Sequence, residues 1–342
     1  MKILQIIDRL EVGGAERVFI DLTNLLYKSK KVEVSILTFD NRGGLYKYLN
    51  PQINKIDFKR KNKFNLFTAY KLSKILRNYD ILHVHMIHVF KYVKFICLIF
   101  NIKTKLVLQD HYGKNSTDKK IPKYLNTFLK PKYYIGVSEE LIDWAKERLN
   151  VFNSYKLTNI VIKEKHLEIT NDKKGFVIVG NIKPIKNQLF AIQLVILMNE
   201  ELTIVGKIQD YDYYNKLLAL INKSNYKNKV HFIHDVNNVQ PLLSQFKLGL
   251  MTSISESGPL VLIEYLAQNL PFLSYETGEV SQNLKKEIPS FFIKNFILNE
   301  WQEKINLINN KTEALEELYT KHYSEKKYTN ECLKIYQKIK NS

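Results

Sequence analysis

Short apolar runs alternate with longer segments of helical periodicity along most of the chain. The run at residues 2–7 is followed by a loop with two glycines and by a segment in which Val18, Leu22 and Leu25 recur at helical spacing. The same pattern predicts strands at 2–7, 32–37, 81–84, 105–108 and 133–137, and helices at 67–76, 89–100, 121–129 and 138–149. Strands that alternate with helices indicate a parallel sheet covered on both faces.

A second unit of the same kind follows a charged break at residues 156–172, which we interpret as a linker. Its apolar runs predict strands at 176–180, 202–205, 230–233, 248–251 and 271–274, and helical patterns at 298–308 and 312–339 close the chain. The sequence therefore predicts an α/β protein with two doubly wound domains, at residues 1–160 and 173–310.

Residues 255–264 join the predicted strand at 248–251 to an apolar helical pattern. Pro259 suits the first turn of a helix, and Gly258 lets the backbone approach a ligand closely. The N–H groups of Leu260 and Val261 would then point out of a helix N-terminus, which favours an anion such as phosphate.

Two carboxylates flank this predicted anion site. Glu256 stands in the loop before the helix, and Glu264 stands just over one turn inside it. Carboxylates do not favour a bare phosphate, but they can bind the hydroxyl groups of a nucleotide sugar. The alternative is a capped helix with two solvated glutamates.

Histidines stand at the carboxyl ends of two predicted strands of the first domain. His83 and His85 end one strand, and we expect them to orient that strand end. His111 follows the next strand, where a neutral imidazole can donate one hydrogen bond and accept another. A purely structural histidine is the alternative. His85 and His88 have metal-pair spacing, but no third ligand is near in sequence, so no metal site is predicted.

The segment from Glu256 to Glu264 resembles the E-x7-E signature of the retaining GT-B glycosyltransferases, in particular family 4. Residues 13–17, Gly-Gly-Ala-Glu-Arg, resemble the opening loop of that family. The segment at 180–188 resembles its G-R-x-x-x-x-K-N loop, in which Lys186 matches the lysine. Asn181 stands where the family has arginine, so one positive charge is missing.

The resemblance implies a role for each matched residue. Glu256 would contact the donor sugar and Glu264 the ribose, and His111 would also contact the sugar. Lys186 would neutralise the departing diphosphate, with Lys183 a candidate for the missing charge. The remaining implied donor-binding residues are Gly13, Gly14, Asn181, Ser257, Gly258, Pro259, Leu260 and Val261.

The resemblance also implies a fold and a reaction. The two Rossmann-like domains would face a cleft, and residues 311–342 would cross back as a helix to the first domain, with tyrosines 319, 323, 328 and 336 packing there. The enzyme would transfer a sugar with retention from a UDP- or GDP-linked donor, bound by the second domain, to a glycan or lipid-linked acceptor, bound by the first. It would need no metal and no cofactor. Because Asn181 lacks a charge, the alternative is a weak or inactive relative that acts as a binding subunit.

The chain carries a large excess of positive charge, with 52 basic and 34 acidic residues and a formal net charge of +18. Such an excess favours nucleic acid, an anionic membrane or a polyanionic substrate, although drift of a lysine-rich coding sequence is an alternative. No nucleic-acid reader motif is present, so we expect no nucleic-acid partner. Two stretches that interleave basic and aromatic residues, 58–74 and 114–132, indicate possible docking on an anionic membrane surface.

The remaining composition points to a reducing compartment. Cys97 and Cys332 are distant in sequence and predict neither a disulfide framework nor a zinc site. The N-terminal residues predict a strand rather than a signal peptide, and no apolar run approaches the roughly 18 residues needed to span a bilayer. We therefore expect a cytoplasmic protein, peripheral on the inner face of the cytoplasmic membrane if the basic stretches dock there.

Overall fold

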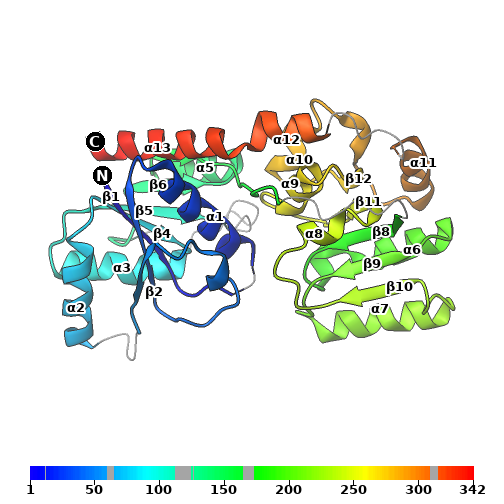
Figure 1. The fold of residues 1–342 in the computed structure, drawn as a ribbon, viewed down its shortest axis with the longest axis horizontal. Coiled ribbons are helices and arrows are strands. Elements are labelled where there is room, and N and C mark those ends of the chain that lie inside the picture. The colour runs from blue at the N-terminus through cyan, green and yellow to red at the C-terminus, as the bar shows by residue number, and fades with distance from the viewer. Residues whose placement is uncertain (12, 60–64, 112–124, 126, 165–172, 309–314) are drawn as a thin grey trace. The chain divides into compact units, whose positions relative to one another are not determined.

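The computed structural model describes residues 1–342 except 12, 60–64, 112–124, 126, 165–172 and 309–314. The chain divides into two compact units, the first formed by Met1–Ile160 with Glu325–Ser342 and the second by Val161–Ser324. Each unit is a parallel sheet with flanking helices (Figure 1). The predicted fold class of two doubly wound, Rossmann-like domains is confirmed.

The sheet of the first unit has the order β3-β2-β1-β4-β5-β6-β7, and neighbouring strands run parallel. The strands are β1 (Lys2–Ile7), β2 (Glu33–Thr38), β3 (Asn54–Asp57), β4 (Ile81–His85), β5 (Lys105–Asp110), β6 (Tyr133–Gly136) and β7 (Ser154–Lys156). The helices are α1 (Gly14–Ser29), α2 (Leu66–Leu76), α3 (Ile87–Ile99), α5 (Glu139–Glu147) and α13 (Glu325–Asn341), with a 3-10 turn η1 (Tyr46–Tyr48). The strand order reverses between β1 and β4, which is where such folds bind ligands.

Alternate residues of β1 face opposite layers of the first unit. Leu4 and Ile6 belong to a buried cluster with residues of α2, α3 and α5, whereas Ile7 packs with Phe19 and Ile20 of α1. α13 contacts α1, and the two lie over the same side of the sheet (Figure 1). Both faces are therefore covered, which explains why the central strands β1 and β4 are buried along nearly their whole length.

The sheet of the second unit has the order β10-β9-β8-β11-β12-β13, again with parallel neighbours. The strands are β8 (Lys174–Val179), β9 (Leu202–Val205), β10 (Val230–Ile233), β11 (Phe246–Met251), β12 (Phe272–Tyr275) and β13 (Phe292–Ile293). The helices are α6 (Gln188–Met198), α7 (Tyr211–Lys223), α8 (Gln240–Leu243), α9 (Leu260–Ala267), α10 (Glu279–Leu284), α11 (Leu298–Ile308) and α12 (Leu315–Tyr323), with 3-10 turns η3 (Pro184–Lys186) and η4 (Pro289–Phe291). Here the order reverses between β8 and β11.

Helix α9 is fixed on this sheet by Tyr265. The ring lies against Gly249 of β11, where a Cβ atom would come within 2.6 Å of it. The Tyr265 hydroxyl donates a hydrogen bond to the carbonyl oxygen of Leu250 at 3.1 Å. Because the residue is fully buried, this contact sets where α9 begins relative to the end of β11.

The end of the chain differs from the expected single segment at 311–342. Helix α12 belongs to the second unit, where the hydroxyl of Tyr319 donates to the carbonyl oxygen of Val161 at 2.8 Å and Tyr323 joins the core. Helix α13 belongs to the first unit, where Glu325 forms an ion pair with Lys28 at 2.9 Å. Tyr319 and Tyr323 were therefore wrongly assigned to the first domain. The second unit also begins at Val161 rather than at the predicted residue 173.

Within the described residues, no helix is both long enough and apolar enough to cross a membrane.

Candidate functional site

Two of the predicted motifs meet at the carboxyl ends of β8 and β11, where the strand order of the second unit reverses. The Thr252 hydroxyl donates to the carbonyl oxygens of Lys186 and Asn187 at 2.9 and 3.0 Å. The N–H of Ile254 donates to the carbonyl oxygen of Ile185 at 2.9 Å. The turn η3 is thereby held against the loop that leads into α9.

Lys186 and Glu256 form a direct ion pair in this position, through Nζ and Oε1. Their side chains keep 22% and 17% of their surface exposed. The site thus combines an ammonium and a carboxylate that remain partly open to solvent. The pairing is a feature that the sequence pattern did not predict, although it placed both residues in the same site.

A third loop supports the one that carries Glu256. The N–H of Glu256 donates to the hydroxyl of Thr277 at 3.1 Å, and the N–H of Glu279 donates to the carbonyl oxygen of Ser257 at 2.8 Å. Gly278 has φ 81°, and a Cβ atom there would lie 2.8 Å from Cδ of Pro259. Only glycine fits this left-handed position at this close approach. The motifs in the sequence did not indicate this loop, although a glycine soon after a buried strand is a signal for one.

Helix α9 begins at Leu260, with Pro259 before it in an extended conformation. The first N–H groups of a helix have no partner inside it, and the helix dipole makes this end favourable for anions. Glu264 lies one turn into the helix and is partly buried. The local structure is therefore compatible with the predicted arrangement, in which Glu256 and Glu264 flank the anion-binding N–H groups at the start of α9.

Asn181 interacts with the neighbouring loop of the second unit. Its Oδ1 accepts a hydrogen bond from the N–H of Lys207 at 3.4 Å. Its carbonyl oxygen accepts from Nε2 of Gln188 at 3.1 Å. Lys183 stands at the head of η3 and is partly exposed. The residue that replaces the family arginine is thus neutral and bonded to backbone, with a lysine two positions later.

In the first unit, Gly13 precedes the first turn of α1 and Gly14 begins it. A Cβ atom on Gly13 would lie 2.4 Å from Oε2 of Glu16, so the carboxylate folds back over the glycine. Burial raises the pKa of this Glu16 carboxyl. This carboxylate is the end of a flexible side chain, so it could move aside for a Cβ atom.

His111 lies directly after β5 and is connected to β4. Its Nε2 is 3.0 Å from Nδ1 of His85, and the two rings are nearly parallel. Burial lowers the pKa of His111 to about 4, so the ring is neutral near pH 7. His83 and His85 are fully buried at the end of β4.

Two other polar residues, His88 and Asp210, have contacts of their own. His88 is exposed and 3.7 Å from Asp8, and in the described part of the chain no group of three His, Cys, Asp or Glu side chains is arranged to hold a metal ion. Asp210 accepts a hydrogen bond from the N–H of Tyr213 at 2.9 Å. Asp210 therefore caps the N-terminus of α7.

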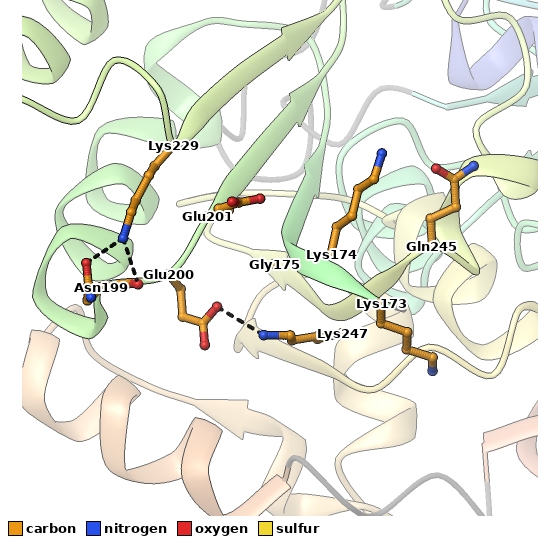
Figure 2. A pocket seen from close by; sticks show the side chains of 9 residues that line it. All are labelled: Lys173, Lys174, Gly175, Asn199, Glu200, Glu201, Lys229, Gln245 and Lys247. Carbon is orange, nitrogen blue, oxygen red and sulfur yellow. Dashed lines mark hydrogen bonds and ion pairs between the residues drawn. The ribbon is translucent and has the colours of Figure 1, made fainter. Parts of the chain in front are cut away.

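A pocket of about 710 Å³ lies at the opposite edge of the second sheet, where its strands begin (Figure 2). Its charges are partly satisfied within the pocket, by a Lys247–Glu200 ion pair at 3.5 Å and by hydrogen bonds from Lys229 to Asn199. The pocket contains none of the predicted donor-binding residues. Its lining is Lys173, Lys174, Gly175, Asn199, Glu200, Glu201, Lys229, Gln245 and Lys247.

The two basic and aromatic stretches lie partly outside the described residues, which exclude 60–64, 112–124 and 126. In the described part, Phe67 of α2 is 66% exposed and lies under Nζ of Lys71, 4.4 Å from the ring centroid. Likewise, Nζ of Lys74 lies over the ring of Tyr70, 4.7 Å from the ring centroid. Helix α2 therefore presents aromatic rings and lysines together on its surface.

Both units match known glycosyltransferase families. Residues 161–326 match the family described as Glycosyl transferases group 1, and residues 12–154 match Glycosyltransferase Family 4. The chain is 25% identical over 330 residues to the capsular polysaccharide biosynthesis glycosyltransferase CapH of Staphylococcus aureus, covering 89% of this chain and 90% of that one. It is 23% identical, over the full length of both, to a Campylobacter jejuni α-1,4-N-acetyl-D-galactosaminyltransferase whose name gives an undecaprenol-linked acceptor.

Solved structures share the fold at lower identity. The Anabaena protein HepE in complex with UDP and glucose aligns with a TM-score of 0.80 at 15% identity, covering 98% of this chain and 99% of that one. TarM of S. aureus aligns with a TM-score of 0.80 at 14% identity, covering 100% of this chain and 99% of that one.

Proposed function

Because the chain belongs to the group 1, family 4 glycosyltransferases of the GT-B fold, we propose that it moves a sugar from a nucleotide-sugar donor to a glycan or lipid-linked acceptor in the assembly of a bacterial surface polysaccharide. The observation that carries this proposal is the pairing of Lys186 with Glu256 beside the start of α9. A cation, a carboxylate and a helix N-terminus together suit a ligand that carries both phosphate and hydroxyl groups. The names of CapH and of the Campylobacter transferase support the biological setting.

The proposed reaction retains the configuration at the anomeric carbon. The bond from that carbon to the diphosphate oxygen breaks, a bond to the acceptor oxygen forms on the same face, and the acceptor proton passes to the departing phosphate. Lys186 and the first N–H groups of α9 stabilise the negative charge that develops on the diphosphate. Glu256 and His111 orient the donor sugar, and Glu264 binds the ribose. Gly13 and Gly14 shape a loop beside the substrates.

We assign the donor to the UDP- or GDP-linked sugars and propose that neither a metal ion nor a cofactor takes part. HepE was solved with UDP and glucose, which supports UDP as the first nucleotide to test. The charge that a metal would supply is assigned instead to Lys186, with Lys183 as a second cation.

A catalytically weak relative that only binds its ligand is the second candidate. It is favoured by Asn181, whose side-chain oxygen binds the N–H of Lys207 and which adds no charge to the site. Both candidates predict binding of a nucleotide, but only the enzyme predicts turnover.

The test begins with a thermal-shift screen of UDP, GDP and their hexose conjugates. A ligand at 100 times its dissociation constant adds about 2.7 kcal/mol to the free energy of unfolding, which is readily measured. Nucleotide release from the best conjugate, with and without EDTA, then measures turnover. Release that continues in EDTA supports the proposal, and strict metal dependence contradicts its metal-free part. Binding without release favours the binding subunit.

Glu256→Ala should abolish nucleotide release, with a loss of at least about 100-fold, because Glu256 is proposed to contact the reacting sugar. The matched control is Glu200→Ala, which removes a carboxylate paired with lysine at the opposite edge of the same sheet. Unchanged release by Glu256→Ala, with the same melting temperature as the wild type, would contradict the proposed donor site.

A lipid-linked acceptor would require the protein to work at a membrane surface. We therefore propose peripheral docking through the first unit on the cytoplasmic face of the membrane. The exposed Phe67 and Tyr70 on α2, with lysines over their rings, support this part of the proposal.

A further inference from the structure

A layer of polar side chains is buried under the C-terminal helix of the first unit. Gln5 of β1 lies opposite His83 of β4 in the sheet register, and His85 lies two residues along the same strand face. All three are fully buried. Tyr336 of α13, also fully buried, reaches this layer from the helix above. Such a layer is costly in a hydrophobic core unless its groups are hydrogen-bonded.

The polar groups form a continuous chain of hydrogen bonds from α13 to His111. Nε2 of Gln5 donates to the hydroxyl of Tyr336 at 2.8 Å, and that hydroxyl is 2.7 Å from Nδ1 of His83. Oε1 of Gln5 is 2.8 Å from Nε2 of His85. Nδ1 of His85 is 3.0 Å from Nε2 of His111.

The direction of this chain follows from the chemistry of neutral imidazole, which carries one ring proton. Burial keeps the rings neutral, lowering the pKa of His111 to about 4 and that of His85 well below its usual value. Because Oε1 of Gln5 can only accept, Nε2 of His85 must carry the proton. Nδ1 of His85 is then an acceptor, so Nε2 of His111 must donate to it.

We infer that Gln5, His85 and Tyr336 are positioning residues that hold His111 in its Nε2–H tautomer, with the lone pair on Nδ1. This rests on the proposed function, in which His111 contacts the donor sugar. His111 would then act toward the sugar as a hydrogen-bond acceptor that orients a hydroxyl group, and not as a donor to the leaving oxygen. Tyr336 takes part because its hydroxyl accepts from Nε2 of Gln5, which leaves Oε1 of the same amide facing His85.

The full-length protein labelled with ¹⁵N in its histidine rings tests this directly, because the ring-nitrogen shifts separate protonated from bare nitrogens. His111→Asn assigns the signals. The expected wild-type spectrum near pH 7 has Nε2 protonated and Nδ1 bare in both His85 and His111. A proton on Nδ1 of His111 would overturn the inference, whatever the activity.

Two phenylalanine variants separate the chain of hydrogen bonds from general packing. Tyr336→Phe should free the Gln5 amide to turn, give a mixture of His111 tautomers and lower kcat by roughly threefold to tenfold. Tyr328→Phe removes another buried hydroxyl from α13. In the described structure this hydroxyl bonds no member of the hydrogen-bond chain, so the variant should change neither the His111 tautomer nor kcat. Equal tautomer spectra in the two variants would refute the role of Tyr336, and if Tyr336→Phe does not fold, Gln5→Met takes its place.

The proposed function can fail separately. If the wild-type tautomers are as expected but His111→Asn releases nucleotide at the wild-type rate, the hydrogen-bond chain stands and His111 has no role at the sugar.

Discussion

Lys186 and Lys183 stand at the two ends of one 3-10 turn but have different surroundings. Lys186 pairs with Glu256 and its backbone carbonyl is bonded by Thr252, so its side chain starts from a fixed position. Lys183 precedes the turn and is partly exposed. The proposed stabilisation of the diphosphate should therefore depend chiefly on Lys186.

Lys186→Ala should reduce kcat by about 100-fold to 1,000-fold, because removing one preorganised group that stabilises transition-state charge has an effect of this size. Nucleotide release under saturating donor measures it, with Lys247→Ala at the far edge of the sheet as the control. A loss below threefold would remove Lys186 from the proposed mechanism.

Lys183→Ala tests whether this lysine supplies the charge that Asn181 lacks. If it does, kcat should fall by at least about tenfold, since each factor of ten corresponds to about 1.4 kcal/mol of transition-state stabilisation. Wild-type kcat in this variant would mean that the charge is not replaced, and the wild-type enzyme should then be slow.

Sequence reasoning at the residue scale works where a residue type has one obvious use. An aspartate just before a helical pattern is a common cap, and Asp210 caps α7 in this way. The sequence could not predict that Thr277 holds the N–H of Glu256, because that contact joins two loops 21 positions apart. It also could not predict Met86, which has φ 75° directly after β4 although methionine has no preference for such a conformation.

The strands and helices are the part that periodicity predicts best. The predicted strands at 202–205 and 230–233 match β9 and β10, and the predicted helix at 298–308 matches α11. The short edge strands β3, β7 and β13 were missed, because they have two to four residues and little apolar character or length to identify them. The predicted helix at 121–129 lies mostly outside the described residues.

The break between α12 and α13 at Ser324 was also missed. The helical pattern continues through it, since apolar positions recur on both sides. What separates the two helices is the core that each one joins, Tyr323 in the second unit and Tyr336 in the first. Such tertiary contacts leave no local signal in the sequence.

The histidines His83 of β4 and His111 directly after β5 should make the stability of the protein sensitive to acid. Burial lowers the pKa of His83 to about 3 and that of His111 to about 4. Between these values and the ordinary pKa of about 6.5, the unfolded chain binds protons that the folded chain does not, so stability falls as the pH falls. The expected loss is roughly 1.4 kcal/mol for each ring at one pH unit below 6.5.

Thermal unfolding of the full chain between pH 7.5 and pH 5 measures this effect. His83→Gln removes one buried ring and should flatten the pH dependence, whereas His88→Gln, which removes an exposed ring, should leave it as in the wild type. A melting temperature that stays constant down to pH 5 would contradict the expected titration.

At the scale of the whole molecule, the net charge of +18 remains to be explained. Two sources are possible, a docking surface on the first unit or a general drift in composition. They differ in where the important lysines are. Docking requires the stretches at 58–74 and 114–132, whereas drift makes all lysines equivalent.

Docking through the first unit predicts that the protein sediments with anionic liposomes at low salt and is released at high salt, because the Debye length falls to about 8 Å at physiological ionic strength. Each lysine near an anionic surface contributes about 1 kcal/mol. Glutamate at positions 59, 61, 119 and 120, three of which lie outside the described residues, should therefore nearly abolish binding, and Phe67→Ala should weaken what remains at high salt.

The control replaces four lysines of the second unit by glutamate and so makes the same change in net charge away from the proposed surface. These are Lys173, Lys174, Lys229 and Lys247, which line the pocket of that unit (Figure 2). Equal losses in the two sets would show that net charge alone attracts the protein, and no sedimentation of the wild type at low salt would make a soluble acceptor the better explanation.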